Sequence, residues 1–253
     1  MKTFWVSFRK DVLEQWRTNR MMIVGVVLVF FGISSPLLAK FMPELLQFIP
    51  GAEQFASLIP QPTVLDAYTQ YLKNIGQFII MLALLVSMGS VAIEKEKGTA
   101  AMMLVKPLPR GTFLLSKFFA LSVTFLTGLA LAALAAYYYT VYLFGTVDFV
   151  AWVTMNALVL VYALMYVAIT LLFSTLVRSQ AAAAGLGFGV LIVFSILSTV
   201  PTFTAYMPAQ LLGWALGALT GSPQSYWPAL GITLGVIGAC LLWAWLAFDR
   251  QEL

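Results

Sequence analysis

Six stretches of this chain are each apolar for long enough to cross a lipid bilayer. A helix that spans about 30 Å of hydrocarbon needs about 20 apolar residues, because each residue adds about 1.5 Å. Of the 253 residues, 61% are hydrophobic and only 9% are charged. Soluble domains carry about 25% charged residues. We therefore predict an all-α polytopic membrane protein with six transmembrane helices. Their approximate ranges are 21–38, 75–93, 113–138, 152–177, 181–200 and 228–248.

Basic residues are unequally distributed between the two sides that six spans define. An even number of spans places both termini on one side, and that side holds all but Lys40 and Lys73 of the 14 Lys and Arg residues. The positive-inside rule identifies this side as the cytoplasm. We expect cytoplasmic N- and C-termini, and we interpret the net charge of +4 as a topology signal that implies no nucleic-acid partner.

The residue types that support most enzymatic chemistry are scarce. The chain has no histidine and one cysteine, Cys240, which excludes Ser-His and Cys-His pairs, His-ligated metals and an intrachain disulfide. The glycines of AAAAGLGFG at 181–189 lie within a span and lack the GxxxxGK[ST] pattern of a nucleotide-binding loop. We expect no catalytic, cofactor-binding or metal-binding residue in this chain, which is predicted not to be an enzyme.

Residues 1–20 have the pattern of an amphipathic helix that lies on the membrane surface. Four apolar residues recur at helical spacing, and charged residues occupy the opposite side. The apolar residues are Trp5, Phe8, Val12 and Trp16. We divide the chain into this interfacial helix and a single transmembrane domain at 21–253.

Two segments on the outer side differ in character. Residues 39–74 contain Pro43, Pro50, Pro60 and Pro62, and we expect short helices broken by turns. Residues 201–227 are too apolar for an aqueous loop and too interrupted by Pro and Gly for a span. Their central LLGWALGAL is about half a membrane long, which predicts a re-entrant or outer-leaflet helical hairpin before the last span.

No ionisable residue lies near the middle of any predicted span. Ion- and proton-coupled carriers need such residues, so the energy for any transport is expected to come from elsewhere. Most Ser, Thr and Asn residues within the spans are expected to form hydrogen bonds between helices.

A small island of charge and proline, IEKEKGTAAMMLVKPLPR, separates the second and third spans at residues 93–110. Gly98 and Thr99 can end one helix and begin the next, residues 100–105 can form a short apolar helix, and Pro107 and Pro109 stop it. Such a helix leaves apolar surface uncovered outside the membrane, which favours docking on a partner. Methionine suits a contact that must adapt while the partner changes shape.

The motif Glu94-Lys95-Glu96-Lys97-Gly98-Thr99, followed by Leu104, Pro107, Arg110 and Lys117, resembles the E-[KR]-E-x-G-T pattern of ABC-2 type transporter permeases, followed there by L, P, R and a later K. The chain is similar in layout to the copper-processing and the multidrug- or peptide-export permeases of that family. The resemblance implies a type V exporter-like fold in the inner membrane of a prokaryote. It also implies a homodimer that pairs with two separate ATPase subunits, which bind ATP and Mg.

The resemblance also implies roles for particular residues. A coupling helix at about 98–108 would sit in a groove of the ATPase, and the N-terminal helix would touch the same subunit; the contact role of Met102 and Met103 rests on their expected exposure. The predicted coupling interface comprises Glu94, Glu96, Gly98, Thr99, Met102, Met103, Leu104, Pro107, Arg110 and Lys117. The candidate outer gate comprises Pro201, Tyr206, Pro208 and Trp214. The segment at 39–74 is a candidate site for a substrate or an extracytoplasmic accessory protein.

We therefore expect a membrane permease subunit that couples ATP hydrolysis by a partner to export. The residues do not identify the substrate, although a path without charges suits an amphipathic one. Two alternatives remain: a stand-alone secondary carrier or channel, which the uncharged spans oppose, and a membrane scaffold or assembly factor.

Overall fold

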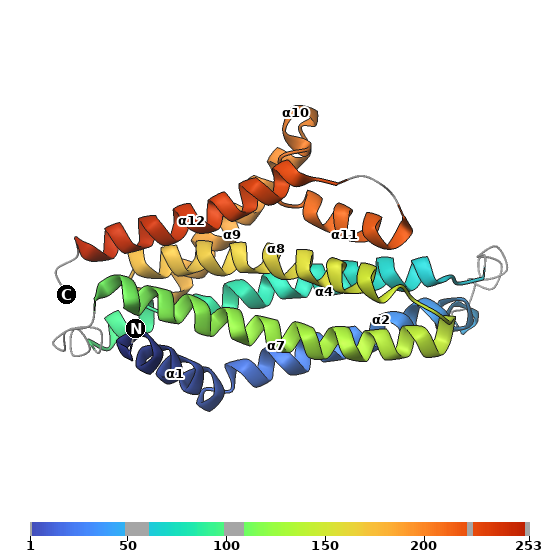
Figure 1. Cartoon of the computed structure of the whole chain (residues 1–253), viewed down its shortest axis with the longest axis horizontal. Coiled ribbons are helices and arrows are strands. Elements are labelled where there is room, and N and C mark those ends of the chain that lie inside the picture. The colour runs from blue at the N-terminus through green and yellow to red at the C-terminus, as the bar shows by residue number, and fades with distance from the viewer. Residues whose placement is uncertain (1, 49–60, 99–108, 222–224, 251–253) are drawn as a thin grey trace.

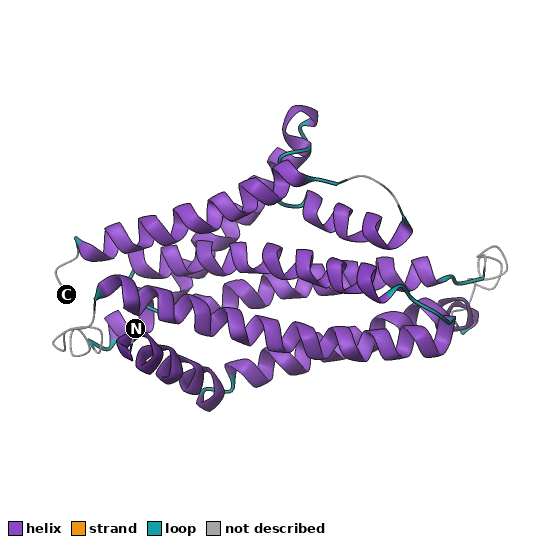
Figure 2. Ribbon diagram, viewed as in Figure 1, coloured by secondary structure: helices purple, strands orange, loops and turns teal. Residues whose placement is uncertain are grey.

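The computed structural model describes residues 2–48, 61–98, 109–221 and 225–250, and all regular secondary structure in these ranges is helical (Figure 2). Helices that are long and apolar enough to cross a membrane number six in this part of the chain, as the sequence predicted. With the labels of Figure 1, the helices are α1 (Lys2–Arg17), α2 (Arg20–Gln47), α4 (Val64–Ser87), α5 (Ala92–Glu96), α7 (Arg110–Phe144), α8 (Phe149–Leu176), α9 (Gln180–Ser198), α10 (Pro201–Thr204), α11 (Gln210–Thr220) and α12 (Trp227–Asp249).

The long helices form an elongated bundle, and both termini lie at the same end of it (Figure 1). We call this the terminal end and the opposite one the distal end. Helices α2 and α7 approach each other closely. A Cβ added at Gly32 would come within 2.7 Å of the Ala132 carbonyl oxygen, and one added at Gly128 within 2.9 Å of Val24. Glycine is thus needed on both helices, as is common where membrane helices pack closely.

The core is centred on α4, α7 and α8, whose buried side chains include Tyr71, Phe125 and Tyr166. Buried polar contacts join these core helices: the Tyr71 hydroxyl of α4 donates to Asn156 Oδ1 of α8 at 2.7 Å, and Trp152 Nε1 of α8 donates to the Ala133 carbonyl of α7 at 3.3 Å. The Asn156 amide donates to the Trp152 carbonyl of its own helix at 2.9 Å. Most other hydroxyls within the spans bond to a carbonyl of their own helix, as Thr124 and Thr170 do. The prediction that they would mainly join different helices was wrong, because a helix carbonyl one turn earlier is always within reach.

Among the six candidate membrane spans, α9 and α12 are the least covered. The only buried residues of α9 are Ala183 and Gly187, and α12 buries only Ala229, Thr233, Ala244 and Phe248 among its described residues. Large apolar residues such as Ile196 and Trp243 are exposed along them. This side of the bundle therefore presents apolar surface to whatever surrounds it.

The outer segment differs from its prediction. Helix α2 continues through Pro36 and Pro43 to Gln47, and α4 begins at Val64, so the described parts of 39–74 extend the two spans and do not form short broken helices. Membrane helices tolerate proline because neighbouring groups can satisfy the freed backbone. The start of α4 is marked by Asp66, which accepts from the backbone N–H and the hydroxyl of Thr63 at 2.7 and 2.8 Å.

The segment before the last span agrees with its prediction. The short helix α11 buries Leu211 and Ala215 and packs along α8 (Figure 1). Its 11 residues correspond to about 16 Å at 1.5 Å per residue, half of a bilayer core. It ends at Gly221, whose φ of 68° lies in the left-handed region that favours glycine after a helix.

Candidate functional site

The candidate site lies at the terminal end, at the two flanks of the segment predicted to form a coupling helix. The residues Thr99, Met102, Met103, Leu104 and Pro107 of that prediction lie outside the described residues. The structure describes the flanks: α5 and Gly98 before the segment, and Arg110 and Lys117 on α7 after it.

Two lysines and two carboxylates from three helices form a group that we call the four-charge cluster: Lys10, Asp11, Glu94 and Lys117. Lys117 Nζ lies 2.8 Å from Glu94 Oε1 and 3.8 Å from Asp11 Oδ1. Lys10 Nζ lies 2.9 Å from Asp11 Oδ1 and 4.0 Å from Glu94 Oε1. The formal charges of the cluster sum to zero. Its ion pairs join α1 to both flanks of the segment.

Three of the cluster's four members are shielded from solvent, whereas the Lys10 side chain is 40% exposed. Asp11, Glu94 and Lys117 are 2%, 7% and 4% exposed. A buried charge without a partner is costly, whereas exposed ion pairs contribute little. Burial disfavours the charged form of Lys10, but the charge and hydrogen bond of Asp11, with Glu94 and Glu14, outweigh this and raise the pKa of Lys10.

Helix α1 docks on α7 through a polar face. Ser7, Asp11 and Gln15 are buried at intervals of four residues, so they share one side of the helix. Ser116 of α7 donates to Asp11 Oδ2 at 2.5 Å, and its hydroxyl lies 2.9 Å from that of Ser7. The polar side that sequence analysis assigned to the aqueous surface is therefore partly a packing surface.

The aromatic residues predicted for the interfacial helix lie on its outer faces. Trp5 and Trp16 are 63% and 67% exposed, and Phe8 and Val12 are half-buried. Exposed tryptophan next to a bundle of membrane spans is typical of the membrane–water interface. This arrangement is compatible with the prediction that α1 lies on the membrane surface.

The short helix α5 is held by α8. Ser174 Oγ accepts from the backbone N–H groups of Val91 and Ala92, both at 3.0 Å. These N–H groups open α5 and have no carbonyl partner within that helix. In return, Lys95 Nζ donates to the carbonyl of Thr175 in the last turn of α8, where helix carbonyls lack partners and a cation is favoured.

Arg110 makes the corresponding connection for α7. Its Nη1 donates to the carbonyls of Phe248 and Asp249 at 2.6 and 2.7 Å, which lie at the C-terminal end of α12. The Phe113 and Phe248 rings stack at 5.5 Å between centroids. The start of α7 is thus attached to the end of the last span.

The described members of the predicted coupling interface fall into two groups. Glu94, Arg110 and Lys117 are engaged within the chain, as described above. Glu96 and Gly98 are exposed, and Gly98 has a φ of 67° with no atom within 4 Å of a Cβ built there. Whether these residues contact a partner stays a prediction.

Sequence analysis missed the residues that complete the site: Asp11 as an ion-pair partner, Ser116, Ser174 and Thr175. The stripe of Ser7, Asp11 and Gln15 at four-residue spacing was a readable signal for a polar packing face. No comparable signal identifies Ser174, because its role depends on where α5 crosses α8. Within the described ranges, no three Cys, Asp or Glu side chains come together as metal ligands would.

The candidate gate residues are not brought together. Pro208 lines a cavity of about 160 Å³ with Tyr162 and Tyr166. Trp214 packs against Trp227 at 5.0 Å between ring centroids, whereas Pro201 and Tyr206 are exposed. Their common role as a gate stays a prediction.

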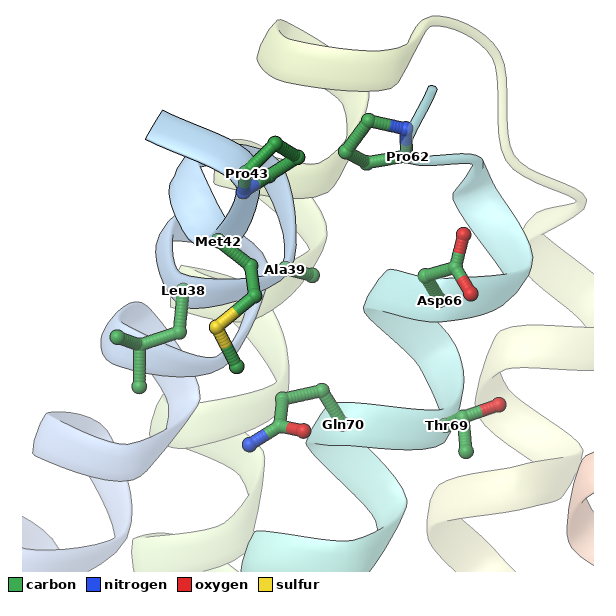
Figure 3. Close-up of a pocket in the computed structure, with 8 residues that line it drawn as sticks. All are labelled: Leu38, Ala39, Met42, Pro43, Pro62, Asp66, Thr69 and Gln70. Carbon is green, nitrogen blue, oxygen red and sulfur yellow. The ribbon is translucent and has the colours of Figure 1, made fainter. Parts of the chain in front are cut away.

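A second hollow lies at the distal end, between the extended ends of α2 and α4 (Figure 3). Its volume is about 350 Å³. Met42 and Leu38 line one side, and Asp66, Thr69 and Gln70 line the other. The Asp66 carboxylate and the Thr69 hydroxyl already form hydrogen bonds within α4 and its N-terminal cap. These two residues therefore offer a ligand in the hollow few polar groups that are not already bonded.

Comparison with known proteins agrees with this architecture. The family described as ABC-2 family transporter protein matches residues 5–253. A relative from Bacillus subtilis (strain 168), named as the uncharacterized transmembrane protein YxlG, is 24% identical over 247 residues, which cover 96% of this chain and 95% of the relative. A family match over nearly the whole length makes the chain a multi-pass membrane component of an ABC transporter and not a catalytic subunit. The chain belongs to the ABC-2 family of transporter proteins.

Proposed function

We propose that this chain is the permease subunit of an ABC exporter, and that it receives the work of ATP hydrolysis at residues 99–108 from separately encoded ATPase subunits. ATP and Mg²⁺ would bind those subunits. The observation that carries the proposal is that the four-charge cluster joins the two flanks of this segment to each other and to α1.

The flanks are tied so that a displacement between them would reach several spans at once. Glu94 and Lys117 connect α5 with α7, Ser174 connects α5 with α8, and Arg110 connects α7 with α12. A partner that moves the intervening residues would therefore displace α5, α7, α8 and α12 together. Packed helices respond to such displacements by switching between discrete arrangements, as alternating access requires.

We further propose that two copies of the chain assemble side by side through the sparsely covered side formed by α9 and α12. Gly185 and Gly189 of α9, and Gly231 and Gly235 of α12, have no atom within 4 Å of a built Cβ. Small residues at four-residue spacing allow close approach of a helix from another copy. Export is proposed as the direction because the motif resembles that of export permeases.

The experiment uses two glycines that are matched in backbone geometry. Gly98 and Gly145 have φ of 67° and 98°, and each donates one backbone hydrogen bond, to Lys95 and Val141 respectively. Proline fixes φ near −65° and removes the backbone donor. Gly98→Pro and Gly145→Pro therefore cause the same kind of backbone perturbation at opposite ends of the bundle.

We expect Gly98→Pro to abolish most of the stimulation of ATP hydrolysis that the reconstituted permease gives its ATPase subunit. Gly145→Pro should retain it, while both variants lose similar thermal stability. Equal loss of stimulation in the two variants, or failure of the detergent-solubilised chain to recruit any ATPase subunit, would contradict the proposed function.

A further inference from the structure

A groove of about 600 Å³ runs along the outside of α2 and α7 in the half of the bundle nearest α1. We call it the α2–α7 groove. Its walls are apolar and include Met22, Val26 and Phe30 of α2 and Leu131 of α7. Both helices are candidate membrane spans, so the groove opens toward the hydrocarbon of the bilayer.

Two glycines give the groove its depth. Gly25 lines it, and a Cβ built there has no atom within 4 Å. Gly128 of α7 also lines it, and a Cβ built there would come within 2.9 Å of Val24. Gly25 therefore leaves space within the groove, and Gly128 allows α2 and α7 to pack closely at its base.

The groove has the length of one leaflet and begins at the membrane surface. It extends from Asn19, in the turn between α1 and α2, to Phe30. The ten residue steps from Arg20 to Phe30 correspond to about 15 Å along a helix, which is half of the roughly 30 Å hydrocarbon core. Trp16, exposed on α1, lines the surface end.

The turn at the surface end of the groove contains two arginines. Arg17 and Arg20 directly follow Trp16 and Asn19, both of which line the groove. Among the described residues, neither guanidinium group takes part in an ion pair, since the ion pairs in this part of the chain belong to the four-charge cluster. The first N–H groups of α2 also lack partners within the helix, and helix N-termini favour anions.

We propose that the α2–α7 groove binds one anionic phospholipid of the leaflet on which α1 lies. An acyl chain fills the groove from Met22 to Phe30, and the phosphate group sits at the turn that carries Arg17 and Arg20. Basic residues beside grooves between membrane helices are a recognised setting for anionic headgroups. Apolar walls over one leaflet match an acyl chain, while the charge at one end matches a headgroup and would repel the equally basic turn of a second copy.

The test measures lipid retained by the full chain. The purified protein is incubated in detergent with equal amounts of phosphatidylglycerol and phosphatidylcholine of the same acyl chains, and native mass spectrometry counts the lipids bound. Phosphatidylglycerol is expected to be retained in preference to phosphatidylcholine, and excess inorganic phosphate is expected not to displace it, because the acyl chain contributes to binding.

Two variants separate the headgroup from the chain. Arg17→Gln with Arg20→Gln should reduce the preference for phosphatidylglycerol on the order of tenfold. Arg9→Gln, at another exposed arginine of α1, is the charge control and should leave it unchanged. Gly25→Leu fills the groove and should lower the binding of both lipids. Gly213→Leu adds the same side chain at an exposed glycine of α11, where a built Cβ meets only the end of the Gln210 side chain at 3.4 Å, and should not lower it.

The proposal is wrong if the double arginine variant keeps the wild-type lipid preference, or if Gly25→Leu retains as much lipid as Gly213→Leu. It is also wrong if Gly25→Leu changes the oligomeric state without changing lipid retention, because the groove would then be an interface between copies. A thermal unfolding curve for each variant verifies that a loss of lipid does not reflect a loss of fold.

Discussion

The two ends of the bundle hold their helices in different ways. At the distal end, helix starts are capped by neighbours in sequence: Asp66 bonds to Thr63, and Asp148 accepts from Val150 and Ala151. At the terminal end, the ties cross the whole chain, as when Lys117 pairs with Asp11 or Arg110 reaches the end of α12. A local cap can break without disturbing other helices, whereas a crossing tie makes several helix ends depend on one another. The terminal end is thus the one at which a local displacement would spread.

The largest expected effect comes from breaking the four-charge cluster. In Lys117→Met, Asp11 and Glu94 are left buried with Lys10 as their one described cation, which should destabilise the protein by about 3–5 kcal/mol. Thermal unfolding of the purified protein measures the loss. Lys73→Met is the matched control, since this exposed lysine of α4 should change stability by no more than about 0.5 kcal/mol.

A double variant sharpens this result. Glu94→Gln combined with Lys117→Met removes one charge of each sign and leaves Lys10 paired with Asp11. It should be more stable than Lys117→Met alone, with a coupling energy within the range of about 0.5–3 kcal/mol known for residues in contact. Additive losses would mean that the two side chains do not act as a pair.

A smaller effect is expected where α8 holds α5. Ser174→Ala removes the acceptor of two buried N–H groups and should cost about 2 kcal/mol. Thr170→Val, one turn earlier on α8, removes a hydroxyl that bonds only to its own helix and should cost less. Hydrogen exchange at Val91 and Ala92 should accelerate only in Ser174→Ala; equal protection in both variants would show that the cross-helix cap is dispensable.

The smallest effect is expected at the distal end. Asp66→Ala removes the local cap of α4 and should cost about 1 kcal/mol or less. Its influence should stay within the first turn of α4, which hydrogen exchange can resolve residue by residue. Faster exchange at the terminal end in this variant would contradict the view that the distal caps are independent of one another.

Much of the fold could be predicted because its main determinant is local. A bilayer demands long apolar helices with internally bonded backbones, and such runs are visible in any window of the sequence. The lengths of α2 and α4 were underestimated for a physical reason. Pro43 was treated as the stop that it would be in water, although the structure continues α2 through it. The Thr63 and Asp66 pair, three residues apart, was a helix-start signal that went unused.

The site was predictable only in part, because its charges are satisfied at long range. The motif directed attention to Glu94, Arg110 and Lys117. It could not show that their side chains turn inward, since the partners lie on α1 and α12. From the sequence, Asp11 is expected to be one of several charged residues on the water-facing side of a surface helix. The Asp11 carboxylate is buried only because α1 packs on α7. The periodicity of α1 does not identify the helix that covers this residue.

The polar docking face of α1 has a consequence for how the protein is made. Synthesis runs from the N-terminus, so α1 leaves the ribosome long before Glu94 and Lys117, the residues that neutralise its Lys10 and Asp11 in the folded chain. Until α5 and α7 have been inserted, its charges remain in water while its tryptophans can already rest on the lipid. Helix α1 is synthesised before α5 and α7 but is among the last helices to reach its final position, and its docking completes the assembly of the terminal end.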